Sequence, residues 1–188
     1  DENDLESLHA IADQLWGDSE SGVKHVGKGR VHWGKTLDEV LKEERIAPDV
    51  IVPEGLDINW IHKKTDDADI YFVASKMDKP VDVSLSFKVS GSPQLWDAFT
   101  GNQQDAKIWK SKADRTNVVI SLPENGSTVV VFSNKAKEPY AYKVTANGET
   151  VLNTQMGWYK IHETENTNSL IWKNDVVIAE NSGVYNFH

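Results

Sequence analysis

The sequence predicts a mainly β protein: an antiparallel, jelly-roll-like β-sandwich preceded by a short α/β segment. In the first fifty residues apolar residues recur at helical spacing, whereas from about Ile58 they alternate with polar residues. Turn residues then separate the alternating runs about every ten residues, a spacing that is typical of sandwiches. We therefore expect a helix–strand–helix segment over residues 1–56 and an antiparallel β-sandwich domain over residues 57–188.

Residues 3–16 have the pattern of an amphipathic helix. Asn3 or Asp4 can cap its first turn, and Gly17 can end it. Its apolar positions lie mostly three or four residues apart: Leu5, Leu8, Ile11, Ala12, Leu15 and Trp16. This spacing predicts a helix with one apolar face.

A short strand over residues 28–34 and a second helix are expected next. Thr36 is positioned to cap that helix with Glu39 as its capping-box partner, and Pro48 to close it off. A single strand cannot form a complete α/β sheet, because it has no parallel neighbour. We therefore interpret residues 1–56 as the last part of a larger α/β domain.

Strict alternation marks the predicted sandwich strands. From Val81 to Val89 apolar residues alternate with polar ones, which predicts one buried and one solvated face. The run that starts at Val118 repeats the pattern. Asn147 and Gly148 stand between two strand-like runs and predict a tight hairpin, because this pair suits a turn with positive φ at both central positions.

The composition argues against several classes of protein. The formal net charge is −9, and Lys and Arg are dispersed among carboxylates, so nucleic acid is not expected as a partner. No apolar run is long enough for a membrane span. The absence of cysteine excludes disulfides, cysteine–zinc sites and a thiol nucleophile. Because the sequence starts at Asp1 without a leader, we expect an excised or processed piece of a longer protein.

The sequence predicts no metal site and no cofactor. The six histidines show neither His-x-His nor His-x-x-x-His spacing. The acidic run from Thr65 to Asp69 lacks the glycine and the distal glutamate of a calcium loop, so we interpret it as a solvated turn. Gly27 and Gly29 precede a predicted strand, whereas the glycines of a dinucleotide site follow a strand and open a helix.

Seven tryptophans are many for this length and raise the question of carbohydrate binding. Aromatic rings pack on the apolar faces of sugars, so exposed rings favour such a function. Trp60 and Trp109 lie beside polar neighbours and are candidates for exposed, carbohydrate-contacting positions, whereas Trp33 and Trp96 are better explained as buried. The alternative for Trp60 and Trp109 is packing in the core.

His62 and Lys63 complete the set of candidate carbohydrate-binding residues. They lie next to Trp60, where the first segment meets the sandwich, and ligand sites favour such junctions. His62 can donate or accept hydrogen bonds, and Lys63 supplies a charged donor. Alternation along a strand places Lys63 on the opposite face from Trp60 and His62, so all three converge only at a bulge or a strand end.

Three segments of the chain form an ordered set: residues 8–50, with Gly-Lys-Gly-Arg-Val-His-Trp-Gly; residues 58–75; and residues 93–132, with Leu-Trp-Asp-Ala-Phe-Thr-Gly. In order and spacing they resemble the stretch that follows the catalytic region in large bacterial glycoside hydrolases of the α-L-rhamnosidase type. This chain departs from the family pattern at Lys63, where the family tends to show Arg, and at Gln94, where the family favours Glu.

The resemblance implies a non-catalytic, C-terminal accessory region that packs on the catalytic domain of the same parent chain. In such enzymes the catalytic acids lie in an upstream barrel domain, so no catalytic residue is expected here. The resemblance also implies action of the parent on polysaccharide, an oligosaccharide as a ligand, and a periplasmic or extracellular location. Acids beside predicted strand ends are interpreted as solvated turn residues rather than as the paired carboxylates of a glycosidase: Asp57, Asp66, Asp67, Asp69 and Asp97.

Two alternatives stay open beside the accessory role. The chain could be a carbohydrate-binding sandwich module, which an accessible pair of aromatic side chains would favour. It could also be a purely structural interaction domain with all aromatic residues buried. A broad apolar patch on the first fifty residues would favour the accessory role, because the end of a larger domain must leave a former interface uncovered.

Overall fold

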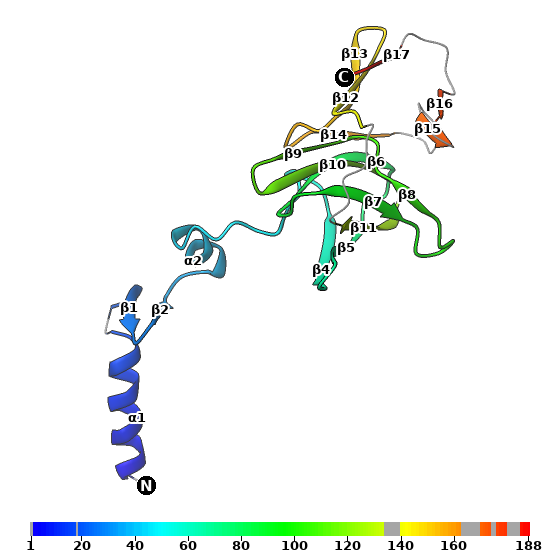
Figure 1. Cartoon of the computed structure of the whole chain (residues 1–188). Coiled ribbons are helices and arrows are strands. Elements are labelled where there is room, and N and C mark those ends of the chain that lie inside the picture. Colours follow the sequence, from blue (N-terminus) through cyan, green and yellow to red (C-terminus); the bar gives the residue numbers. More distant parts are fainter. Residues whose placement is uncertain (1, 18, 134–139, 163–169, 174–175, 180–184) are drawn as a thin grey trace. The chain divides into compact units, whose positions relative to one another are not determined.

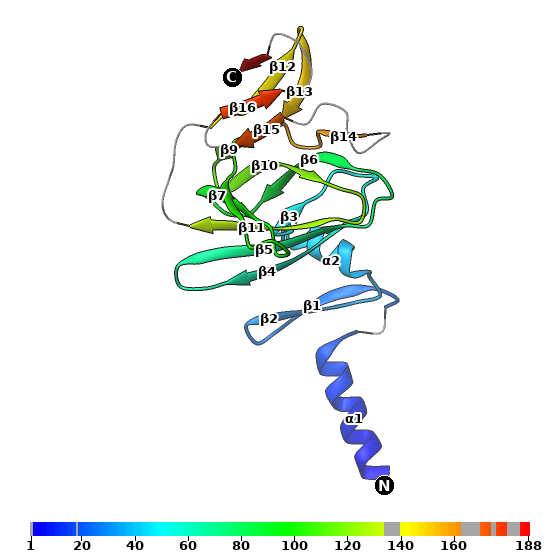
Figure 2. The same cartoon turned by 90° about the vertical axis from the view of Figure 1, so that its right-hand side faces the viewer.

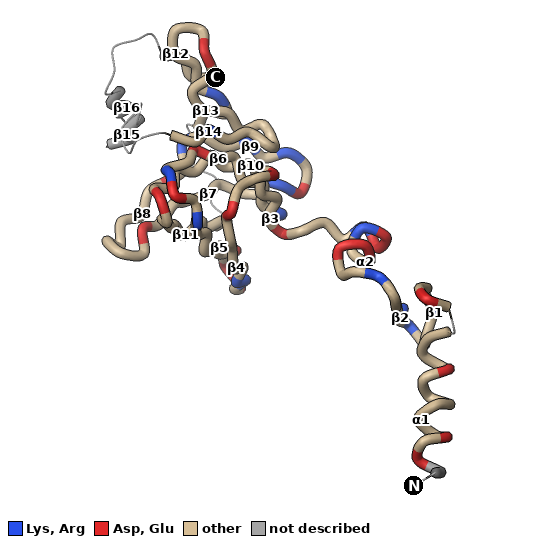
Figure 3. Tube along the Cα trace, turned by 180° about the vertical axis from the view of Figure 1, so that it is seen from behind, with Lys and Arg blue, Asp and Glu red and all other residues tan. Residues whose placement is uncertain are grey.

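The computed structural model describes residues 2–17, 19–133, 140–162, 170–173, 176–179 and 185–188 (Figures 1 and 2). The chain divides into two compact units, residues 1–48 and residues 49–188. No helix among the described residues is long and apolar enough to cross a membrane. Lys and Arg positions are interspersed with Asp and Glu positions in both units (Figure 3).

The first unit is a helix, a β-hairpin and a second helix. Its elements are α1 (Glu2–Leu15), β1 (Gly22–Val26), β2 (Gly29–Trp33) and α2 (Leu37–Glu43). The hairpin is antiparallel, and Gly27 in its turn has a φ of 58°. The prediction of a single unpaired strand was therefore wrong: β1 was missed because Val23, Lys24 and His25 carry no strand-like alternation, and β2 takes β1 as its antiparallel partner.

The predicted capping box at α2 is confirmed. The side-chain oxygen of Thr36 accepts from the Glu39 backbone N–H at 3.4 Å, and the Glu39 carboxylate accepts from the Thr36 N–H at 2.8 Å. These two contacts satisfy N–H groups that the first turn of a helix otherwise leaves without partners. The backbone N–H and hydroxyl of Thr36 both contact the Glu39 carboxylate, so the pKa of Glu39 is held below its usual value.

The second unit contains two five-stranded antiparallel sheets, which lie one over the other (Figure 2). The first sheet has the order β14 (Tyr159–Ile161), β6 (Val81–Phe87), β10 (Arg115–Leu122), β9 (Trp109–Lys112), with β3 (Val50–Ile51) also paired to β6. The second has the order β4 (Ile58–Lys64), β5 (Ala68–Ser75), β11 (Ser127–Ser133), β7 (Ser92–Trp96), β8 (Gln103–Asp105). The predicted mainly β, antiparallel, sandwich-like fold is confirmed.

Two smaller sheets complete the unit. One consists of β13 (Glu149–Asn153), β12 (Lys143–Ala146) and β17 (Tyr185–Phe187), and the other of β15 (Leu170–Lys173) and β16 (Val176–Ala179). The predicted hairpin joins β12 to β13: Asn147 has a φ of 50° and Gly148 a φ of 86°. Positive φ at both positions is what this turn requires, and Asn and Gly tolerate it better than other residues.

Aromatic side chains from both sheets meet in the main core. The Tyr71 ring lies 4.9 Å from that of Phe87 and 5.9 Å from that of Phe132, both edge-on. Val50 is buried in the same core. The predicted division after residue 56 therefore falls inside the second unit, because β3 already belongs to the first sheet of the sandwich.

The predicted solvated face of β6 is wrong, because every residue of this strand is buried. A second apolar cluster lies beside the polar face, with Val119 of β10 packed among Val144 and Leu152 of the β12–β13 hairpin. This hairpin lies on the side of the first sheet that faces away from the main core (Figure 2). The polar side chains of β6 are therefore enclosed, and Asp82 and Ser86 make hydrogen bonds inside the protein.

Candidate functional site

Strand β4 carries three of the four predicted carbohydrate-binding residues. It pairs with β5 without a bulge, from Ile58 opposite Ser75 to Lys64 opposite Asp69. Trp60 and His62 therefore point to the core side of the sheet and Lys63 to the outer side. Trp60 is partly buried and packs against the main core. The three residues do not converge on one surface.

His62 is held between two carboxylates and an aromatic ring. Its Nδ1 lies 3.0 Å from Asp49 Oδ2 and its Nε2 lies 2.8 Å from Asp69 Oδ1. Its ring stacks on Tyr71 with the centroids 4.2 Å apart and the planes 8° from parallel. Carboxylates only accept, so both contacts are hydrogen bonds when both ring nitrogens carry hydrogen. This arrangement uses both nitrogens of His62 within the protein and leaves neither for a ligand.

The surroundings of this histidine fix the chain where the sandwich begins. Arg115 donates through Nη2 to the backbone oxygens of Asp49 and Ser86, at 3.2 and 2.7 Å. Lys64 Nζ lies 3.6 Å from Asp69 Oδ2. The Asp49–His62–Asp69 group therefore has Arg115 beside Asp49 and Lys64 beside Asp69. The group thus joins the segment before β3 to β4, β5 and β10. Sequence reasoning found His62 but missed Asp49 and Arg115, since no local spacing links them.

Tyr71, under the His62 ring, has a buried hydroxyl that makes no hydrogen bond within the described part of the chain. Burial raises the pKa of Tyr71 above its usual range, and the nearby carboxylates of Asp69 and Asp49 raise it further. The folded protein therefore favours the neutral phenol strongly over the phenolate.

We expect Tyr71→Phe to change the unfolding free energy at pH 7 by less than about 1 kcal/mol, because the lost hydroxyl has no hydrogen-bond partner among the described residues. An unfolded tyrosine ionises near pH 10, but Tyr71 resists ionisation in the fold, so the wild type loses stability as the pH rises above that value. The variant should then become more stable than the wild type, by up to about 1.4 kcal/mol per pH unit.

Urea unfolding of both proteins at pH 7 and pH 11 measures this difference. Tyr142→Phe is the matched control, since Tyr142 is 42% exposed whereas Tyr71 is fully buried. A gap between Tyr71→Phe and wild type that does not change with pH would contradict the expectation.

Trp109, the fourth candidate, lies on β9 in the other sheet. It is only 7% exposed and belongs to the main core. Its ring stacks on Tyr140 with the centroids 4.1 Å apart. The expected exposure of Trp109 is therefore wrong, because β9 turns this side chain inward despite its polar neighbours. Conversely, Trp33 and Trp96 were expected to be buried, and both are partly exposed.

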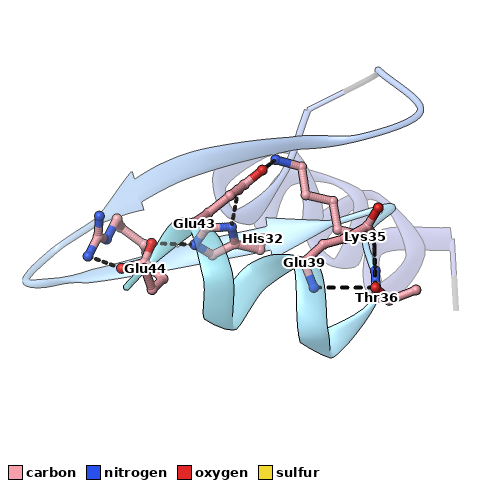
Figure 4. Close-up of polar contacts among 7 residues, drawn as sticks. His32, Lys35, Thr36, Glu39, Glu43 and Glu44 are labelled. Atoms are coloured by element: carbon pink, nitrogen blue, oxygen red, sulfur yellow. Dashed lines mark hydrogen bonds and ion pairs between the residues drawn. The ribbon is translucent and has the colours of Figure 1, made fainter. Parts of the chain in front are cut away.

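A second polar cluster ties the hairpin of the first unit to α2 (Figure 4). His32 Nε2 lies 2.9 Å from Glu44 Oε1, and Glu44 also forms an ion pair with Arg30. Lys35 Nζ donates to both carboxylate oxygens of Glu43, at 2.6 and 2.7 Å. Each charged group is engaged by an opposite charge or a histidine, so the cluster is explained as a structural fastening between β2 and α2.

A third group joins Ser121, Asp82 and His162, but in the wrong order for a nucleophilic site. Ser121 Oγ donates to Asp82 Oδ1 at 2.5 Å, and His162 Nε2 lies 2.8 Å from Asp82 Oδ2. In a catalytic triad the histidine contacts the serine and removes its proton. Here the carboxylate lies between them, so this group fastens β14 to β6 and does not activate the serine.

Two described carboxyl groups have a clearly shifted pKa, in the direction opposite to that of a general acid. Glu39 and Asp97 are the two whose pKa departs clearly from its usual value, and both are lowered. A glycosidase needs one carboxyl group with a raised pKa as its proton donor. The described residues also contain no cluster of three or more His, Asp or Glu side chains that could hold a metal ion.

The first unit exposes large apolar side chains. Leu5, Leu8 and Ile11 lie three residues apart on α1, so they share one side of the helix, and each is more than half exposed. Further exposed residues of this unit are Trp16, Val23, Leu37 and Ile46. Isolated exposed apolar residues are ordinary, but a continuous row along a helix marks a surface that another polypeptide covers.

Comparisons with known proteins place these features in context. Residues 1–110 match the profile of glycoside hydrolase family 106, described as alpha-L-rhamnosidase. A protein of Formosa agariphila named "Putative beta-glucuronidase" is 32% identical over 131 residues, which are 68% of this chain and 10% of that protein. The solved structure of a rhamnosidase from Novosphingobium sp. PP1Y matches with a TM-score of 0.62 and 24% identity, over 78% of this chain and 15% of that one. This chain thus spans a small part of the relatives that it matches.

Proposed function

Because this chain belongs to the alpha-L-rhamnosidase family 106 of glycoside hydrolases, we propose that it is a non-catalytic accessory region of a larger glycoside hydrolase that acts on polysaccharide. The observation that carries this proposal is the exposed apolar side of α1, formed by Leu5, Leu8 and Ile11. The proposed cover for this surface is the catalytic domain of the same parent chain. The matched relatives are several times longer than this chain, which supports such a cover.

Two further observations support an accessory rather than a catalytic role. The histidines with carboxylate contacts, His32, His62 and His162, serve as fastenings between elements. The carboxyl pKa values that depart clearly from normal in the described residues are lowered, which suits hydrogen-bonded turn and cap residues. A periplasmic or extracellular location is proposed with this role, from the function of the family.

We expect no turnover of an aryl α-L-rhamnoside by the 188-residue chain, because the role proposed for it provides no acid–base pair. Release of the chromophore is followed against a buffer blank and against a parallel preparation from cells without the protein. Turnover that co-purifies with the chain and exceeds both blanks would contradict the proposal.

The docking role has its own test. A double variant, Leu8→Asp with Ile11→Asp, should weaken association of the chain with the separately produced remainder of its parent enzyme, as measured by gel filtration. Glu6→Lys on the same helix is the control, since it changes charge at a polar position and leaves the apolar row intact. Equal association by both variants would show that this surface does not dock.

A further inference from the structure

The two sandwich sheets differ in what lies on their outer faces. The first sheet is covered by the cluster that contains Val119, Val144 and Leu152. The second sheet, β4–β5–β11–β7–β8, carries a row of register partners on its outer face: Ile61, Phe72, Val129 and Trp96. Residues directly opposite each other in antiparallel strands share a face, so these four form one continuous row across four strands. We name it the outer row.

The outer row is apolar and open to solvent. Ile61 is 69% exposed and Phe72 is 40% exposed, and both Val129 and Trp96 are partly exposed. The solvated face of an antiparallel sheet normally carries polar residues, so this row departs from the usual pattern. The four side chains expose on the order of 300 Å² together, taking 150–250 Å² for a whole aromatic side chain.

This area indicates the size of the ligand. A stable protein interface covers about 800 Å² on each partner, well above the area of the outer row. A ligand of a few rings, which lies flat across the strands, needs no more than the row provides. Neighbouring strands are about 4.8 Å apart, so Phe72 and Trp96, separated by one strand, have their backbones roughly 9.6 Å apart. Two or three linked sugar rings cover such a distance.

Polar groups lie beside the row. Trp96 Nε1 donates to Gln94 Oε1 at 3.2 Å, and Gln94 Nε2 donates to Asp105 Oδ1 at 2.9 Å. These two bonds fix the indole ring and the amide on the outer face. Lys63, whose side chain is exposed, lies on the same face of β4, two residues from Ile61. A ligand on the row therefore meets aromatic carbon below and hydrogen-bonding groups along one side.

The turn after Trp96 presents one more aromatic ring. Asp97 accepts through Oδ1 from the backbone N–H groups of Phe99 and Thr100, at 2.8 and 3.2 Å, and through Oδ2 from the Thr100 hydroxyl at 2.8 Å. Phe99 is 98% exposed in this hydrogen-bonded turn. An aromatic residue presented on an ordered turn loses little conformational freedom when it binds.

We propose that the outer row is a glycan-binding surface that takes a neutral oligosaccharide of at least two sugar rings. Sugar rings present an apolar face of C–H groups and a rim of hydroxyl groups. Phe72 and Trp96 contact the apolar faces, with Ile61 and Val129 between and beside them. Gln94 and Lys63 bind hydroxyl groups at the rim, and Phe99 extends the surface past the end of β7. Deoxy sugars with a methyl group suit this apolar row best.

This surface differs from the site predicted around Trp60 and His62, of which it keeps only Lys63. Trp60 and His62 lie on the inner side of β4, where the main core and two carboxylates hold them. The glycan surface also uses none of the residues on the apolar side of α1, on which the accessory role depends. Each proposal can therefore fail without the other.

Isothermal titration of the 188-residue chain with α-linked L-rhamnose mono-, di- and trisaccharides tests the surface. We expect a dissociation constant on the order of 1 mM for the trisaccharide, and weaker binding of the monosaccharide, which cannot reach both rings. Phe72→Ala and Trp96→Ala should each weaken binding by about tenfold or more. Phe187→Ala is the matched control, because Phe187 is 43% exposed on β17, in a different sheet, and its loss should change binding less than about twofold.

Ile61→Glu is a further variant that keeps the fold, since this side chain is largely exposed, and it should abolish binding by placing a charge on the row. Circular dichroism and melting temperature confirm that each variant is folded. Absence of binding by the wild type would overturn the proposal, as would equal losses in Phe72→Ala and Phe187→Ala. Self-association of the wild type that Ile61→Glu abolishes, without any sugar binding, would instead identify the row as a protein contact.

Discussion

Replacing Gly34 with alanine will destabilise the first unit, because it pushes the end of β2 away from the residues that precede β1. Gly34 follows β2 with a φ of 67°, a conformation that costs other residues about 1–2 kcal/mol. An added Cβ would also overlap the backbone carbonyl of Glu20 and come within 2.8 Å of the Ser21 Cα. Backbone atoms cannot turn aside as a side chain can. We expect the first unit to lose several kcal/mol in all, on the order of 3 kcal/mol or more.

Gly27→Ala is the matched control for this change. Gly27 lies in the turn of the same hairpin, has a φ of 58°, and has open space where its Cβ would stand. It should therefore show only the conformational cost of about 1–2 kcal/mol. Amide hydrogen exchange of β1 and β2 reports the two effects separately from the sandwich. If the amides of β1 and β2 were equally protected from exchange in Gly34→Ala and Gly27→Ala, the close approach of Gly34 to Glu20 would not contribute to the loss of stability.

Phe87→Ala will destabilise the sandwich by about 3–5 kcal/mol, the usual range for removing a buried aromatic ring. Phe87 is fully buried, and its ring lies 4.9 Å from Tyr71 and 5.3 Å from Phe132. The three rings come from β6, β5 and β11 and join the two sheets. Loss of the Phe87 ring leaves a cavity that β6 cannot close by moving, because hydrogen bonds hold the strand on both edges.

Guanidinium chloride unfolding measures this loss, and Phe72→Ala supplies the comparison within the same unit. Phe72 lies on β5 next to Tyr71 but faces outward, so we expect its removal to cost less than about 1.5 kcal/mol. If Phe87→Ala also lost less than about 1.5 kcal/mol of unfolding free energy, the core would have repacked around the missing ring.

Features set by neighbouring residues were predictable from the sequence. The Thr36–Glu39 capping box depends on residues three positions apart, and the Asn147–Gly148 turn depends on two adjacent residues with the required backbone preference. The change of period near Ile58 likewise coincides with the start of β4, although the sandwich already begins with β3. Each of these signals acts within a few positions along the chain.

Features set by pairing across the sheets were not predictable. Asp49 meets His62 because β3 and β4 lie in different sheets that the main core brings together, and no spacing in the sequence records this. Trp96 was interpreted as buried from its apolar neighbours, but register with Val129 and Phe72 places it on the outer face. The polar face of β6 was expected to be wet, yet the β12–β13 hairpin, about sixty residues later, covers it.

Strand β6 shares one of its edges between two partners from opposite ends of the unit. Val50 and Ile51 of β3 pair with its Phe87 end, and β14, from Tyr159 to Ile161, pairs with its Val81 end. During synthesis β6 therefore leaves the ribosome long before its edge can be closed, and open edges recruit other chains. Asp82 places a carboxylate on that half of the strand, and charged residues on an open strand discourage such pairing until β14 arrives and His162 contacts the carboxylate. Asp82 therefore has two uses: its charge protects the open edge of β6 while the chain is incomplete, and its contact with His162 holds β14 in place in the finished protein.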